Sequence, residues 1–205
     1  MSETLTPETV GFIGLGNMGQ PMCHRLLEAG YHVVAYDLAD EALAEVAAAG
    51  ATPASNVAEV AAACDVLLTS LPRPDHVEAV MEGAGALAAL RPGSCWVDLT
   101  TNRRELVQRL AAAAPAGVTV ADSPLTGAVD GARNGRLTLF IGGDDATNAA
   151  SQSAEPETSS DDDTASDSAT PAAAAPTVRK IDGPAAEAID LMEMGGSSIA
   201  KRAAP

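Results

Sequence analysis

Three glycines near the start of the chain could hold a phosphate group. Gly14, Gly16 and Gly19 form the pattern Gly-x-Gly-x-x-Gly, between a predicted strand and a predicted helix. In this pattern the first glycine permits a tight turn, the second lets the backbone approach a pyrophosphate, and the third lets the helix pack closely on the strand. The alternative is a glycine-rich turn without a ligand. The predicted cofactor-binding turn comprises Gly14, Leu15, Gly16, Asn17, Met18 and Gly19.

A carboxylate stands at the position that such a turn requires. Asp37 lies 18 residues after Gly19, near the expected place of the acid that binds the hydroxyls of an adenine ribose. A carboxylate there repels a 2′-phosphate, and no arginine or lysine occurs between residues 37 and 72. We therefore predict NAD as the cofactor in preference to NADP. The alternative is that Asp37 caps the following helix, although Asp40 could do so instead.

The elements that must position these residues alternate between strand and helix. Apolar runs predict buried strands, and apolar residues at helical spacing predict helices. This alternation predicts an α/β fold of the Rossmann type, with a doubly wound, mostly parallel sheet and helices on both faces. Ser55 and Asp75 are the expected N-caps of two of the helices. Strands are expected at residues 10–15, 32–36, 66–70, 95–98, 118–122 and 137–141, and helices at 17–29, 40–49, 55–63, 75–81, 87–90 and 103–114.

Composition excludes several classes of partner. The chain has 205 residues and a formal net charge of -16, which argues against nucleic acid because phosphate-binding surfaces are basic. It contains no apolar run of about 18 residues, so we expect no membrane partner. The 3 cysteines are far apart and suit a reducing compartment, and the polar N-terminus does not resemble a signal peptide. We expect a cytoplasmic protein.

The alternation of strands and helices stops at residues 142–143. Residues 144–205 hold 12 acidic and 4 basic residues, and every aromatic residue precedes residue 141. A segment with so few large apolar side chains cannot offset the entropy lost on ordering. We therefore predict a dinucleotide-binding domain over residues 1–146. Residues 147–205 should form a low-complexity acidic tail, rich in Ala, Pro and Ser and mostly disordered.

Longer segments resemble a known family. Residues 11–22, Gly-Phe-Ile-Gly-Leu-Gly-Asn-Met-Gly-Gln-Pro-Met, are similar to the N-terminal signature of the β-hydroxyacid dehydrogenases. That family includes 3-hydroxyisobutyrate dehydrogenase and 6-phosphogluconate dehydrogenase. Three later segments match in order, and the resemblance covers about residues 9–146. These segments are Ser70-Leu-Pro72, Asp98-Leu-Thr-Thr101 and Asp122-Ser-Pro-Leu-Thr-Gly-Ala128.

The resemblance implies roles for residues beyond the glycine turn. Leu71 and Pro72 would lie against the cofactor, and Thr101 would touch its nicotinamide side. Thr126 would meet the carboxylate or hydroxyl of a substrate, and Gly127 would offer a backbone N–H; a turn-stabilising hydroxyl is the alternative for Thr126. The family has a glycine where this chain has Ala128, which restricts the backbone of the loop.

The implied reaction is hydride transfer between NAD and a small 3-hydroxy acid or semialdehyde. Family members continue into a helical domain that carries a catalytic lysine and through which they oligomerise. No such segment is readable here, so we assign no catalytic residue and expect a chain truncated or frameshifted near residue 147. The alternative function is an NAD-binding module without independent catalysis. An imine reductase of the same architecture ranks last, because it also needs the helical domain.

Overall fold

Strands with apolar residues on both faces build the centre of the molecule. The computed structural model describes residues 9–140 and 142–143; residues 1–8, residue 141 and residues 144–205, which include the expected tail, lie outside the described part. Its main sheet has seven strands in the order β3-β2-β1-β4-β5-β6-β9. The strands are β1 (Thr9–Ile13), β2 (His32–Tyr36), β3 (Thr52–Pro53), β4 (Val66–Thr69), β5 (Cys95–Asp98), β6 (Thr119–Asp122) and β9 (Gly142–Gly143).

The sheet is parallel except at one edge. The pairs β1·β2, β1·β4, β2·β3, β4·β5 and β5·β6 are parallel, and only the pair β6·β9 is antiparallel. The strand order reverses between β1 and β4. In open α/β sheets this reversal opens a crevice outside the carboxyl ends of the two strands, where ligands bind. The predicted Rossmann-type fold is confirmed.

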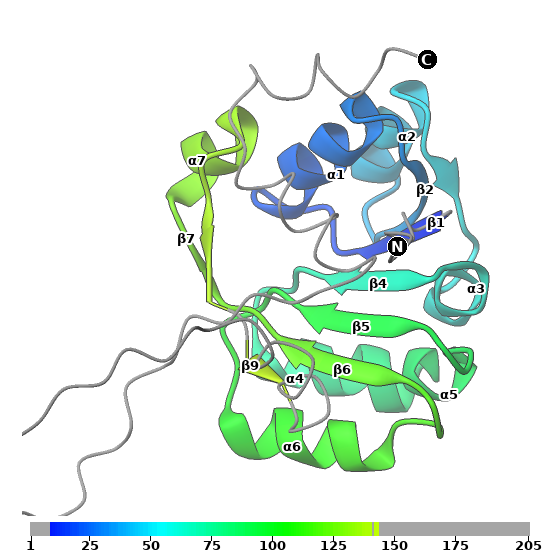
Figure 1. Ribbon diagram of the computed structural model, residues 1–205. Coiled ribbons are helices and arrows are strands. Elements are labelled where there is room, and N and C mark those ends of the chain that lie inside the picture. The colour runs from blue at the N-terminus through cyan, green and yellow to red at the C-terminus, as the bar shows by residue number, and fades with distance from the viewer. Residues whose placement is uncertain (1–8, 141, 144–205) are drawn as a thin grey trace, which may run out of the picture.

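Helices cover both faces of the sheet. Figure 1 shows α1, α2 and α7 on one side, and α4, α5 and α6 on the other. The first face carries α1 (Gly19–Glu28), α2 (Asp40–Ala48) and α7 (Ala128–Asn134). The second carries α3 (Val57–Ala63), α4 (Pro74–Glu78), the π-helix η1 (Ala79–Gly83), α5 (Ala86–Ala89) and α6 (Arg104–Ala113).

Alternation along the strands divides the core into two layers. On β4, Val66 and Leu68 pack in the layer with α1, whereas Leu67 packs in the layer with α3 to α6. Gly11 of β1 faces the second layer, where a Cβ atom would lie 2.7 Å from Cys64 Sγ. A side chain at position 11 would therefore push α3 away from the sheet, because successive strand residues point to opposite faces.

Several local expectations were wrong. Asn56, not Ser55, caps α3, and its side chain accepts the backbone N–H of Glu59 at 2.9 Å. The helix expected at 75–81 begins at Pro74 after an extended Arg73 without a side-chain cap, and continues as a π-helix over 79–83. Proline suits the first turn because its missing N–H has no helical partner there.

The segment after β6 also differs from expectation. Instead of one strand over 137–141, a separate two-stranded antiparallel sheet joins β7 (Leu125–Thr126) to β8 (Thr138–Leu139), with α7 between them. Residue 141 lies outside the described part. The loop that resembles the family's substrate loop is therefore one arm of a small ribbon beside the main sheet (Figure 1).

The three cysteines form no disulfide. Cys23 and Cys64 are buried and Cys95 is partly buried. Burial raises the pKa of the Cys23 and Cys64 thiols to about 12, so both stay protonated and unreactive at neutral pH.

Over the part of the chain that is described, every helix is too short or too polar to cross a bilayer.

Candidate functional site

The glycine turn joins β1 to α1, as predicted. Gly14 has a φ of +96°, which L side chains rarely adopt. A Cβ atom on Gly14 would overlap the carbonyl oxygen of Ser70, and one on Gly19 would overlap the carbonyl oxygen of Gly14. Gly16 differs, because a Cβ atom there would meet nothing within 4 Å. The first and third glycines are thus needed by the fold, whereas the second leaves open space.

The beginning of α1 suits an anion. Met18 is the N-cap and provides no side-chain cap, and the first turn contains no acidic residue. Uncapped N–H groups at a helix N-terminus attract negative groups together with the helix dipole. Gly16 and Asn17 are exposed, whereas Leu15 is buried. The turn therefore presents backbone rather than side chains to solvent.

Asp37 lies directly beside this turn. Its Oδ2 accepts the N–H of Leu15 at 2.5 Å, and its Oδ1 accepts the N–H of Ala39 at 2.8 Å. Asp40 does not cap α2, whose N-cap is Ala39. Asp37 does not cap α2 either, because the start of this helix has no side-chain cap. Its carboxylate instead joins the turn before α2 to the glycine turn.

One cavity joins half of the predicted cofactor residues. It has a volume of about 520 Å³ and lies where the strand order reverses. Gly14, Gly16, Asp37, Leu71 and Pro72 all line it. Its remaining walls come from the ends of β1, β2 and β4 and from α3, α4 and η1. They are Ile13, Tyr36, Leu38, Asn56, Val57, Ser70, His76, Ala79, Val80 and Ala84.

Other predicted residues lie outside this cavity. Leu15 and Gly19 are buried behind the turn, and Thr101 is exposed after β5. Asn17 lines a different cavity of about 460 Å³ between α1 and α7. Thr126 and Gly127 are exposed at the end of the β7–β8 ribbon. The structure therefore brings five of the predicted cofactor residues together and leaves the predicted substrate residues on a separate element.

Sequence reasoning missed the outer wall of the cavity. His76, Ala79 and Val80 come from α4 and the π-helix η1, and π-helical turns are frequent at functional sites. Leu38 is 89% exposed at the same cavity. Because Leu38 directly follows Asp37, the sequence could have placed Leu38 at the cavity. No sequence pattern indicated that residues 76–80 form part of its wall.

A buried carboxylate organises the ends of β4 and β5. Asp98 accepts hydrogen bonds from the hydroxyl of Thr69 at 2.8 Å, the N–H of Thr100 at 3.1 Å and the amide of Asn102 at 2.8 Å. Burial raises its pKa above the usual range, and the hydrogen bonds oppose that rise. Thr100 Oγ1 accepts the N–H of Leu71 at 3.0 Å. The turn after β5 is thereby fixed to the turn that lines the cavity.

The next strand ends with unsatisfied oxygens. Asp122 lies opposite Asp98 in the parallel register. Among the described residues, Asp122 Oδ1 and Ser123 Oγ are buried without a hydrogen-bond partner. Burial, and secondarily the charge of Asp98, raises the pKa of Asp122 to about 6. Buried polar atoms normally have a hydrogen-bond partner. The hydrogen bonding at the end of β6 is therefore incomplete among the described residues.

The loop after β7 contains backbone strain. Ala128 has a φ of +53°, and among the described residues it is the only non-glycine with a positive φ. Left-handed backbone costs an L residue roughly 1–2 kcal/mol. The sequence departure noted at position 128 therefore falls where a glycine would relieve strain, next to Gly127 at a φ of +128°.

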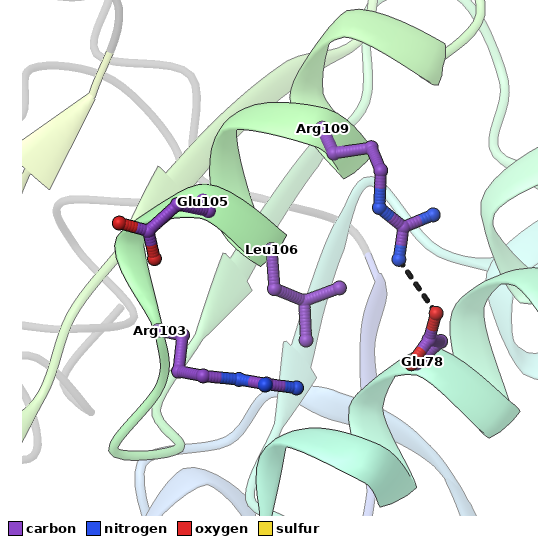
Figure 2. Close-up of a pocket in the computed structure, with 5 residues that line it drawn as sticks. All are labelled: Glu78, Arg103, Glu105, Leu106 and Arg109. Atoms are coloured by element: carbon purple, nitrogen blue, oxygen red, sulfur yellow. Dashed lines mark hydrogen bonds and ion pairs between the residues drawn. The ribbon is translucent and has the colours of Figure 1, made fainter.

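Another cavity lies on the outer face between α4 and α6. It has a volume of about 380 Å³, and Figure 2 shows the Arg103 side chain extending into it toward α4. Arg109 donates to Glu78 at 2.7 Å and to Glu82 at 2.5 Å, and these carboxylates raise the pKa of its guanidinium. Such exposed pairs contribute little stability. Glu78 and Glu82 flank the residues of η1 that wall the first cavity.

The comparison with known families agrees with this geometry. The model of one family, described as the NAD binding domain of 6-phosphogluconate dehydrogenase, matches residues 9–155. The chain belongs to this family. The family's match begins at β1 and includes the glycine turn, Asp37 and the β7–β8 ribbon. The resemblance to β-hydroxyacid dehydrogenases that was drawn from the motifs is confirmed.

Similar proteins include dehydrogenases that are longer than this chain. A 2-(hydroxymethyl)glutarate dehydrogenase of Eubacterium barkeri is 41% identical over 139 residues, which are 67% of this chain and 46% of that protein. The Mycobacterium tuberculosis 3-hydroxyisobutyrate dehydrogenase solved with L-serine has a TM-score of 0.64 and 33% identity, over 72% of this chain and 50% of that one. A structure of Psf3 with NADP+ and 2-OPP has a TM-score of 0.62 and 33% identity, over 68% and 51%. This NAD-binding-domain chain spans about half the length of the curated relatives it matches.

Proposed function

We propose that the chain binds NAD and is the cofactor domain of a dehydrogenase that transfers hydride between NAD and a small 3-hydroxy acid or its semialdehyde. The observation that carries this proposal is the cavity of about 520 Å³ that joins Gly14, Gly16, Asp37, Leu71 and Pro72. It lies at the reversal of strand order, which is where α/β sheets bind dinucleotides. A bound nicotinamide would supply the hydride donor or acceptor.

The residues present fit a dinucleotide. The open space above Gly16 accommodates a close approach of pyrophosphate oxygens, and the uncapped start of α1 supplies N–H donors from residues 16–19. Asp37 would accept from the ribose hydroxyls. The apolar walls formed by Leu71, Val80 and Ala79 suit the faces of an adenine ring.

Charge supports NAD over NADP. Asp37 is the one acidic residue among those that line the cavity, and no arginine or lysine lines it within the described chain. A 2′-phosphate would therefore meet a carboxylate without a compensating cation. The related Psf3 structure contains NADP+, so this preference needs a direct measurement.

The substrate side is assigned to the elements beyond β5. Thr101 would border the nicotinamide, as the resemblance to the β-hydroxyacid dehydrogenases implies, and its neighbour Thr100 fixes the turn at the cavity. Thr126 and Gly127 would contact the substrate's carboxylate or hydroxyl from the β7–β8 ribbon. The class of substrate rests on relatives named for 3-hydroxyisobutyrate and 2-(hydroxymethyl)glutarate.

A second candidate is an NAD-binding module without independent catalysis. The observation that favours it is the absence of lysine from the described residues, since Lys180 and Lys201 lie beyond residue 143. Loss of a general acid lowers a rate by about 10²- to 10⁴-fold. We further propose residues 1–146 as the domain, a cytoplasmic location consistent with the free thiols, and no nucleic-acid or membrane partner.

Calorimetry tests the binding of the cofactor first, and steady-state kinetics then test the hydride transfer. Titration of the chain with NAD should give saturable binding, and titration with NADP should give weaker binding or none. Absence of heat with NAD at millimolar concentration would overturn the cofactor assignment. NADH production from 3-hydroxyisobutyrate would establish catalysis, whereas NAD binding without turnover favours the second candidate.

A further inference from the structure

We propose that Asp37 is also a positioning residue for the phosphate-binding turn, which its carboxylate holds in shape before any ligand arrives. This inference rests on the proposed NAD site and adds a role to the ribose contact. The carboxylate connects two turns that follow different strands, because it accepts the N–H of Leu15 after β1 and the N–H of Ala39 after β2. Hydrogen bonds to a charged acceptor are stronger than neutral ones.

The glycine turn is fastened to β2 at two consecutive residues. Gly14 donates its N–H to the carbonyl oxygen of Tyr36 at 3.1 Å, and Leu15 donates its N–H to Asp37. The side chain of Leu15 is only 2% exposed and packs in the core layer beneath α1. Without Asp37, the N–H of Leu15 would lose its partner at a partly buried position, and unpaired buried donors are costly.

The hydrogen bond also decides which backbone groups remain for the phosphates. The N–H of Leu15 points to Asp37, so a pyrophosphate must use donors from Gly16 onward. Gly16 and Asn17 are exposed and nothing occupies the space above Gly16. A fixed turn keeps these donors aimed outward, which removes the ordering cost that binding would otherwise include.

Positioning and ribose binding are compatible on one side chain. A carboxylate has about four acceptor sites, and Asp37 uses two of them for Leu15 and Ala39. The remaining sites can accept the two ribose hydroxyls. The two roles differ in the ligands that they affect, because only positioning of the turn alters the binding of a ligand that lacks a ribose.

Inorganic pyrophosphate therefore separates the two roles. We would titrate the ¹⁵N-labelled 205-residue chain with pyrophosphate and with NAD, following amide shifts of residues 14–19. Asp37→Ala should weaken pyrophosphate binding about tenfold relative to Asp40→Ala. Asp40 is an exposed acid at the start of α2, so its variant corrects for the general effect of removing one negative charge. Asp37→Asn, which keeps one oxygen acceptor, should fall between the wild type and Asp37→Ala.

Hydrogen exchange of Leu15 gives a readout that needs no ligand. Its amide should be protected in the wild type and in Asp40→Ala, and should exchange about tenfold faster in Asp37→Ala. Unchanged Leu15 exchange, or pyrophosphate binding by Asp37→Ala equal to that of Asp40→Ala while NAD binding falls, would overturn the positioning role alone. A wild type that binds no NAD would overturn the proposed function and the positioning role with it. If Asp37→Ala does not fold, the same comparisons are made with Asp37→Asn.

Discussion

The carboxyl edge of the sheet has two sides that differ in how their polar groups are satisfied. On the glycine side, formed by residues 14–19, 36–39 and 70–72, backbone and side-chain groups bind one another around an open cavity. On the β6 side, formed by residues 122–128, two buried oxygens have no partner among the described residues and Ala128 is strained.

The two sides therefore differ in whether their polar groups already have partners among the described residues. On the glycine side, hydrogen bonds hold Asp37 against the glycine turn, and apolar residues line the cavity beside them. The β6 side holds groups that need further contacts, either from a ligand or from more chain. Substitutions on the glycine side should therefore weaken or abolish binding, whereas substitutions on the β6 side should change stability.

The largest loss of stability should follow from a substitution at Gly19 on the glycine side. Gly19→Ala places a Cβ atom on the carbonyl oxygen of Gly14, so α1 must move away from β1. We expect a loss of about 3 kcal/mol in the free energy of unfolding, together with loss of NAD binding. Urea unfolding measures the first and calorimetry the second. Gly83→Ala is the matched control, since nothing lies within 4 Å of its Cβ position. Its stability should equal that of the wild type or exceed it by up to about 1 kcal/mol, because alanine restricts the unfolded chain.

Gly16→Ala should separate binding from folding. A Cβ atom at Gly16 meets no protein atom within 4 Å, so the free energy of unfolding should stay within about 0.5 kcal/mol of the wild type. The methyl group would occupy the space through which a pyrophosphate approaches, and NAD affinity should fall about 10- to 100-fold. Calorimetry checks the affinity. Full NAD affinity in this variant would place the pyrophosphate elsewhere.

Ionisation of Asp122 should make the stability of the folded chain depend on pH. Its pKa is raised from 3.8 to about 6 in the folded chain, first by burial and then by the charge of Asp98. The folded state therefore favours the protonated carboxyl. The contribution of Asp122 to the free energy of unfolding is fully present below about pH 4 and is lost as the pH rises through 6. Complete burial would make this loss about 3 kcal/mol, and partial exposure reduces our expectation to about 1 kcal/mol.

Asp122→Asn should remove that dependence. The amide stays neutral, so the variant should gain about 1 kcal/mol over the wild type at pH 8 and lose this advantage at pH 4. Urea unfolding at both pH values measures the difference between the two proteins. Asp130→Asn, at an exposed site in α7, serves as the control. An equal difference at both pH values would mean that Asp122 ionises without a penalty.

The smallest effect concerns the strain at Ala128. Ala128→Gly should stabilise the chain by about 0.5–1 kcal/mol, because glycine adopts a φ of +53° without the steric penalty. Ala132→Gly in α7 should destabilise it by about 1 kcal/mol, since Ala132 is buried in a helix. Thermal unfolding of the two variants should shift in opposite directions. A shift of the same sign would indicate that the backbone at Ala128 is not strained.

Prediction from sequence succeeded where the signal was local. The apolar run around Phe12 and Ile13, followed by three glycines, specified the strand, the turn and the helix, because each has its own steric requirement. Asp37 was placed beside the turn by spacing alone. Its hydrogen bond to Leu15 was not predictable, since it depends on how two separate turns meet in the folded chain.

The expectations that were wrong concern short or tertiary features. β7 and β8 have two residues each, too few to show a period of two. The π-helix at 79–83 leaves no mark in the spacing of Val77 and Met81. Asn56 rather than Ser55 caps α3, and both residue types are good caps, so composition does not choose between neighbours.

The two edges of the main sheet differ in their capacity to recruit another strand. β3 ends in Pro53, which has no N–H to offer an incoming chain and so blocks extension of that edge. At the opposite edge, the described residues of β9 pair with Ala121 and Asp122, although β6 begins at Thr119. Within the described part of the chain, β9 therefore leaves the backbone of Thr119 and Val120 uncovered on this side of β6. Of the described strands, β6 is thus the one at which strand addition between copies of the chain should begin, and a charged residue in place of Thr119 should suppress it.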